Sequence, residues 1–111
     1  MRPIFDNHMH LQPSGRGVGA LLDFSKAGGT HAILCHMPYR EVAISTGEDF
    51  SRSYDITLSL ADRANAETGV KVFPAVGPYP VLLIGLTERF GMPRAVEVMR
   101  EGMERAQKLV L

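Results

Sequence analysis

The chain has 111 residues, of which 45% are hydrophobic and 22% are charged. This length is enough for one hydrophobic core and too short for two. Twelve basic residues balance twelve acidic ones, which disfavours binding to nucleic acid through bulk positive charge. The single cysteine, Cys35, excludes an internal disulfide and a cysteine-rich zinc module. The longest apolar run, residues 81–86, is too short for a membrane helix, and the first residues carry no apolar signal-peptide core. We therefore expect a cytoplasmic protein with no membrane partner.

Apolar segments alternate with helical patterns in the first third of the chain. Residues 4–10 predict a short strand that runs into a Pro-Ser-Gly loop. Residues 17–27 place apolar side chains at helical spacing, and Gly28-Gly29 is a helix stop. Residues 30–36 form a compact apolar run, which is typical of a buried strand in a parallel sheet.

The same alternation continues to the end of the chain. A second helix is predicted from Phe50 to Gly69, preceded by Thr46 and Asp49 at the spacing of a capping box. Residues 70–76 predict a third strand, and residues 80–90 predict a short helix. Pro93 opens a last helix, on which five apolar side chains share one face that we expect to be core: Val96, Met99, Met103, Ala106 and Val110.

The resulting order is β-α-β-α-β-α-α, which predicts an α/β fold with parallel strands and helices packed outside the sheet. The third strand would be left as an open edge. We therefore expect the chain to be the opening part of a larger α/β fold, and the open edge to be a place where a second copy pairs.

The most specific pattern for chemistry is Asp6-Asn7-His8-Met9-His10, at the carboxyl end of the first predicted strand. Side chains alternate along a strand, so Asp6, His8 and His10 are predicted to share one face. Two imidazoles at this spacing suit one divalent metal ion, and Asp6 suits a role in orienting a histidine or contacting the metal. The alternative is that the spacing of two polar loop residues is fortuitous.

Three further residues are candidates for substrate binding. His36 ends the second predicted strand, and Arg16 and Arg40 lie in the loops after the first and second strands. Forked guanidinium donors suit phosphate or carboxylate groups, although solvated loop arginines fit the same pattern. Tyr39 and Tyr79 each lie beside a proline after a strand, where either rigid loop packing or a pocket mouth fits.

The segment Gly15-Arg16-Gly17-Val18-Gly19-Ala20 matches the form of a dinucleotide fingerprint. It begins well after the strand, and Cys35-His36 occupies the place where an acid would bind the ribose. A nucleotide-binding βαβ domain is therefore a minor alternative.

The chain resembles the metal-dependent amidohydrolase superfamily, and within it the archaeal-type branch of the TatD-related hydrolases, which are described as deoxyribonucleases. The resemblance runs over nearly the whole chain. It rests on three segments: residues 6–11, Asp23-Phe24 with residues 27–31, and residues 75–80. Gly77-Pro78-Tyr79 departs from the Gly-x-His-Pro found there in bacterial relatives.

The resemblance implies a TIM-type (β/α)8 barrel, of which residues 1–111 would be a single incomplete domain with about three βα units. It implies one or two divalent ions, Zn²⁺, Mn²⁺ or Mg²⁺, that activate water to cleave a phosphodiester or a related bond in a small anionic substrate or a nucleic-acid end. His8 and His10 match the first-strand ligands, and Asp6 matches the acid that precedes them.

Family members take a Glu, further His residues and an Asp from later strands, and these ligands have no counterpart in the chain. The acids after Val76 all fall on predicted helices. We therefore do not expect the 111 residues alone to turn over substrate. The alternative function is that of a non-catalytic half-barrel fragment or assembly module.

Overall fold

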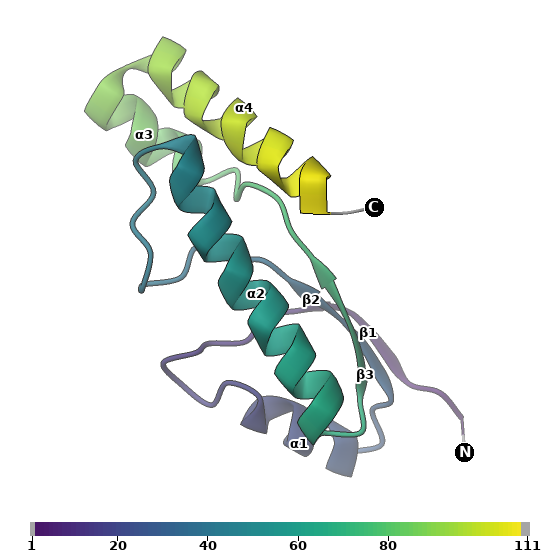
Figure 1. Cartoon of the computed structure of the whole chain (residues 1–111). Helices are drawn as coiled ribbons and strands as arrows, with labels where there is room; N and C mark the ends of the chain where they lie inside the picture. Colours follow the sequence, from purple (N-terminus) through teal and green to yellow (C-terminus); the bar gives the residue numbers. More distant parts are fainter. Residues whose placement is uncertain (1, 110–111) are drawn as a thin grey trace. The chain divides into compact units, whose positions relative to one another are not determined.

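The computed structural model describes residues 2–109, and its element order confirms the alternation expected from the sequence (Figure 1). Each strand is short, and glycines or prolines separate it from the next helix. The elements are β1 (Phe5–Met9), α1 (Gly19–Lys26), β2 (His31–Cys35), α2 (Gly47–Glu67), β3 (Lys71–Ala75), α3 (Leu82–Phe90) and α4 (Met92–Leu109). None of these helices is long and apolar enough to span a bilayer.

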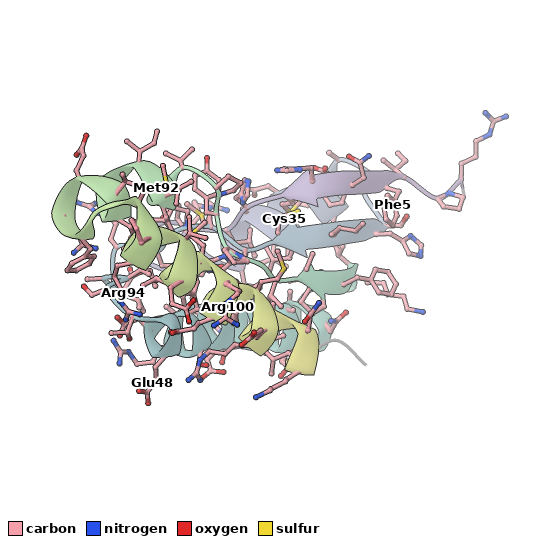
Figure 2. The ribbon with its side chains drawn as sticks, turned by 90° about the horizontal axis from the view of Figure 1, so that it is seen from above. Phe5, Cys35, Glu48, Met92, Arg94 and Arg100 are labelled. Atoms are coloured by element: carbon pink, nitrogen blue, oxygen red, sulfur yellow. The ribbon has the colours of Figure 1, made fainter. Side chains whose placement is uncertain are left out.

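The strands form a three-stranded parallel sheet in the order β1-β2-β3. In register, His31 of β2 lies opposite Phe5 of β1 and Lys71 of β3. Figure 2 shows the side chain of Phe5 near the start of β1 and Cys35 at the end of β2. Because β2 is central, β1 and β3 are both edge strands of the sheet in the described part of the chain.

The chain divides into two compact units. The first comprises the residues up to Cys35 together with Ile56–Ala75, and therefore holds the sheet, α1 and the second half of α2. The second comprises His36–Asp55 and the residues from Val76 onward, with the first half of α2, α3 and α4.

In the first unit, one side chain ties α2 to β3. The Asn65 amide donates to the carbonyl of Val72 at 2.9 Å, and its oxygen accepts from the Val72 N–H at 2.9 Å. This pair of bonds satisfies both backbone groups of an edge-strand residue, which fixes the strand against the helix. Ala32 and Leu34 of β2 are fully buried, as expected for a central parallel strand.

In the second unit, the core forms where α2 packs on α4. Phe50 and Tyr54 are fully buried, and the Tyr54 hydroxyl donates to the Gly102 carbonyl at 2.8 Å. A Cβ at Gly102 would lie 2.5 Å from Cδ2 of Phe50, so the glycine inside α4 is required by packing. Burial raises the pKa of Tyr54, which keeps the hydroxyl a proton donor at neutral pH.

The predicted core face of α4 is partly wrong. Val96 and Met103 are 50% and 52% exposed, whereas Met99 packs against the core and Ala106 is buried. The buried face is rotated along the helix and consists of Ala95, Val98, Gly102 and Ala106. The small residues allow the aromatic rings of α2 to approach closely, which a count of apolar positions does not reveal. Val110, the fifth member of the predicted face, lies outside the described residues.

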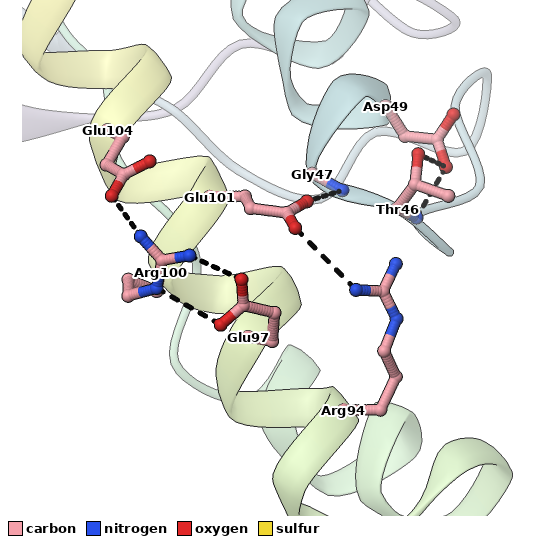
Figure 3. Close-up of polar contacts among 8 residues, drawn as sticks. All are labelled: Thr46, Gly47, Asp49, Arg94, Glu97, Arg100, Glu101 and Glu104. Carbon is pink, nitrogen blue, oxygen red and sulfur yellow. Dashed lines mark hydrogen bonds and ion pairs between the residues drawn. The ribbon is translucent and has the colours of Figure 1, made fainter.

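The start of α2 is held by two carboxylates (Figure 3). Asp49 accepts from the backbone N–H of Thr46 at 2.9 Å, as predicted for one half of a capping box, and also from the N–H of Ser45 at 2.8 Å. The Thr46 hydroxyl donates to the same carboxylate at 3.2 Å. Glu101 of α4 accepts from the N–H of Gly47 at 3.1 Å and pairs with Arg94 at 3.6 Å.

Candidate functional site

The carboxyl end of β1 brings two histidine side chains together. His8 and His10 are exposed, and their Nε2 atoms lie 3.1 Å apart. Their rings meet edge to face, with centroids 4.9 Å apart and planes at 78°. The predicted convergence of these two imidazoles is therefore present in the first unit.

A backbone contact fixes the tautomer of one member of this pair. Nδ1 of His10 lies 3.1 Å from the carbonyl oxygen of Cys35, the last residue of β2. A carbonyl only accepts, so Nδ1 carries the proton and Nε2 of neutral His10 holds a lone pair. Nε2 of His8 therefore donates a proton to the lone pair of His10. In the other tautomer of His8, Nε2 would itself hold a lone pair.

Asp6 is not grouped with the two histidines, because β1 contains a bulge. Between Asp6 and Met9 the strand advances three residues while its partner β2 advances two. The less exposed side chains are accordingly Asp6 and Met9, and His8 is exposed. A bulge interrupts the alternation that predicted a common face for Asp6, His8 and His10. The Asp6 carboxylate instead accepts from the backbone N–H of His8 at 2.9 Å.

The pair meets one geometric condition for binding a single cation. Two nitrogens that each lie about 2.0–2.1 Å from one ion are at most about 4.2 Å apart, and the Nε2 atoms of His8 and His10 lie 3.1 Å apart. Within residues 2–109, no group of three or more His, Cys, Asp or Glu side chains is arranged to hold a metal. The two histidines would thus supply only part of a ligand set.

His36 has a different environment in the second unit. It is 7% exposed, with Nδ1 2.8 Å from the Gly77 carbonyl and Nε2 2.6 Å from the Ser53 hydroxyl. The carbonyl acceptor requires a proton on Nδ1, so Nε2 accepts from Ser53. The ring also packs edge to face on Tyr54, with centroids 4.9 Å apart. These contacts indicate a structural link between three segments of this unit, not the accessible side chain expected of a substrate-binding residue.

The two arginines expected near the site differ in their contacts. Arg16 pairs with Asp23 at 2.6 Å and donates to the Gly19 carbonyl at 3.0 Å, so it ties the loop to α1. Arg40 is exposed in the segment between β2 and α2 and belongs to the second unit. Both remain predictions as substrate-binding residues.

No family model, curated protein or solved structure matches the chain.

The N–H groups of the glycines in the loop after β1 donate to carbonyls of the chain. The N–H of Gly15 and that of Gly17 both donate to the carbonyl of Gln12, at 3.0 and 2.9 Å. A phosphate-binding loop needs such donors free to face the ligand. This arrangement disfavours the nucleotide-binding alternative.

The hydrogen-bond partners of His10 and His36 were missed by sequence reasoning. The Cys35 carbonyl that orients His10 is a backbone group, and residue identity carries no signal for it. Ser53 could have been noticed, because it falls on the buried stripe of α2 beside Phe50 and Thr57. A hydroxyl buried at such a position requires a polar partner.

Proposed function

We propose that the chain supplies the first part of a TIM-type (β/α)8 barrel hydrolase that depends on a divalent metal. His8 and His10 would be two of the metal ligands. The observation that carries this proposal is the 3.1 Å approach of their Nε2 atoms at the carboxyl end of a parallel strand. Parallel α/β folds place their sites at that end.

The chain's own residues prepare such a site in two ways. The bond from His10 Nδ1 to the Cys35 carbonyl orients the ring and leaves Nε2 as the donor atom. His8 is exposed beside the bulge, and its ring meets that of His10 edge to face. Asp6 is proposed as a group that orients His8, because its carboxylate accepts from the His8 backbone N–H.

A divalent cation held here would lower the pKa of a coordinated water and polarise the bond to be cleaved. Zn²⁺ and Mn²⁺ suit nitrogen donors combined with carboxylates, and Mg²⁺ is the harder alternative. We propose a phosphodiester or related bond in a small anionic substrate as the target, with Arg40 and Arg16 as candidate anion-binding residues. The remaining ligands would come from outside residues 2–109.

Hydrolysis of bis(4-nitrophenyl) phosphate with Mn²⁺ or Zn²⁺ tests the proposal in a longer protein that contains this chain. We expect metal-dependent release of 4-nitrophenolate that is abolished by His8→Ala combined with His10→Ala. The control is His31→Ala, which removes an imidazole from the same unit but not from the pair. Hydrolysis that persists unchanged in the double variant would overturn the proposal.

A second candidate function is assembly through the sheet. Both β1 and β3 are edge strands in the described residues, and Phe5 and Phe73 on these strands are 51% and 43% exposed. Exposed edges with apolar side chains favour pairing with another strand. A homodimer by light scattering that dissociates in Phe73→Lys would support this candidate, and a monomer at high concentration would contradict it.

A further inference from the structure

A groove beside α3 has the composition of a small-molecule site. It lies within the second unit, between the segment that follows β2 and the start of α3, is open to solvent and has a volume of about 370 Å³. We call it the α3 groove; its main side chains are Val42, Ile44, Tyr79, Leu82, Leu86 and Arg89. Its size and largely apolar wall are those of pockets that hold small ligands.

Arg89 is the charged group of this groove. Its Nη2 donates to the Ile44 carbonyl at 2.6 Å and its Nη1 to the Ser45 hydroxyl at 3.3 Å. The guanidinium also lies 4.8 Å from the centroid of the Phe90 ring. These neutral partners hold the side chain in place and leave several of its five N–H donors available.

The charge of Arg89 is not offset by a carboxylate within residues 2–109. Several other arginines of the described chain do form ion pairs with Asp or Glu: Arg16, Arg52, Arg63, Arg94 and Arg100. A positioned guanidinium with neutral partners, at the edge of an apolar groove, is complementary to an anion that carries an apolar body.

Gly85 leaves unoccupied space at the lining of the groove. It lines the groove from α3, and a Cβ built on it meets no atom within 4 Å. A glycine inside a helix lowers helix stability relative to alanine, so this position costs the helix some stability without relieving any clash. The space that Gly85 leaves is available to a ligand.

We propose that the α3 groove binds a small amphipathic carboxylate, whose apolar ring or chain contacts the partly exposed Val42 and Leu82 and whose carboxylate pairs with Arg89. Tyr79, which is 37% exposed, flanks the mouth and offers an aromatic surface. This site is independent of the histidine pair. It assigns a ligand class to a part of the chain that the proposed hydrolysis does not use.

Saturation-transfer NMR with 3-phenylpropionate as the probe tests the proposal on the metal-free chain. We expect transfer to the ring protons, and at least about tenfold weaker binding of the neutral analogue 3-phenylpropanamide, because it lacks the charge-assisted bonds. Equal binding of acid and amide, or no transfer at millimolar probe, would overturn the proposal.

Two variants locate the site. Gly85→Leu adds a side chain to the lining of the groove at a position where a Cβ meets no atom within 4 Å. Arg89→Met removes the charge but keeps an apolar stem, and each variant is expected to weaken binding at least about tenfold. Arg63→Met removes a charge on α2 that does not line the groove, and binding should be unchanged. Circular dichroism checks each fold, and Gly85→Leu remains decisive if Arg89→Met unfolds. Undiminished binding in folded Gly85→Leu would contradict the assignment.

Discussion

The two histidine environments of the chain differ in exposure and in partners. His8 and His10 lie exposed at the end of an edge strand and contact each other. His36 is 7% exposed and hydrogen-bonded through both ring nitrogens to groups of its own unit. The first arrangement leaves two exposed Nε2 atoms that an external ion could contact in place of their mutual bond, whereas the second uses both ring nitrogens for the fold. The same residue type at the end of neighbouring strands thus lies in two different environments.

The largest effect should come from removing the buried imidazole. His36→Ala leaves the Ser53 hydroxyl and the Gly77 carbonyl without their partner and removes the ring that packs on Tyr54. We expect a loss of about 3 kcal/mol in the free energy of unfolding. Urea denaturation measures it, and a loss below about 0.5 kcal/mol would show that His36 is not a structural link.

The core beside His36 provides the next largest effect. Gly102→Ala places a Cβ 2.5 Å from Phe50, and we expect the strain to exceed the gain in helix propensity, for a net loss of about 2 kcal/mol. Gly85→Ala is the matched control, because its Cβ meets nothing within 4 Å and it should stabilise the chain. Equal effects of the two substitutions on the thermal midpoint would contradict the packing described for α2 and α4.

A smaller effect on stability is expected at the start of α2, where the change removes a charged carboxylate instead of altering the packing of the core. The N–H of Ser45, together with Thr46, holds the pKa of Asp49 below its usual value, against the effect of burial. Its stabilisation is therefore complete above the unfolded-state pKa, near 3.8, and is lost as the pH falls through the lower folded-state pKa. Asp49→Asn should cost about 1 kcal/mol at neutral pH.

The pH dependence of unfolding checks this assignment. Asp49→Asn should flatten the fall in stability below pH 3.8 relative to the parent chain. Glu48→Gln, an exposed neighbour in the same helical turn, is the control and should leave the slope unchanged. An identical slope in Asp49→Asn and the parent chain would contradict the role of the carboxylate.

The smallest effect on stability should come from the exposed pair. His8→Ala and His10→Ala remove side chains that contact water, so each should change the free energy of unfolding by no more than about 0.5 kcal/mol. Compared with His36→Ala, these two variants should show the largest difference in the free energy of unfolding among the histidine substitutions. A loss of more than about 2 kcal/mol in either variant, measured by urea denaturation, would assign the pair a structural role instead.

The order of elements could be predicted because glycine and proline stops separate short apolar runs, as at Gly28-Gly29 between α1 and β2. The convergence of His8 and His10 also followed from their spacing. The bulge that separates Asp6 from them depends on the pairing of β1 with β2, which spacing does not encode. The partners of His36 and the rotation of the α4 core face likewise depend on contacts between distant segments, such as Gly102 with Phe50.

Metal binding by the isolated chain is the most direct test of the contrast between the two environments. In a Mn²⁺ titration followed by NMR, we expect selective broadening of the His8 and His10 ring signals, with that of His36 much less affected. We also expect the broadening to disappear in the His8→Ala/His10→Ala double variant. Equal broadening of all histidines, or broadening that survives in the double variant, would show that His8 and His10 are not a preferred metal site.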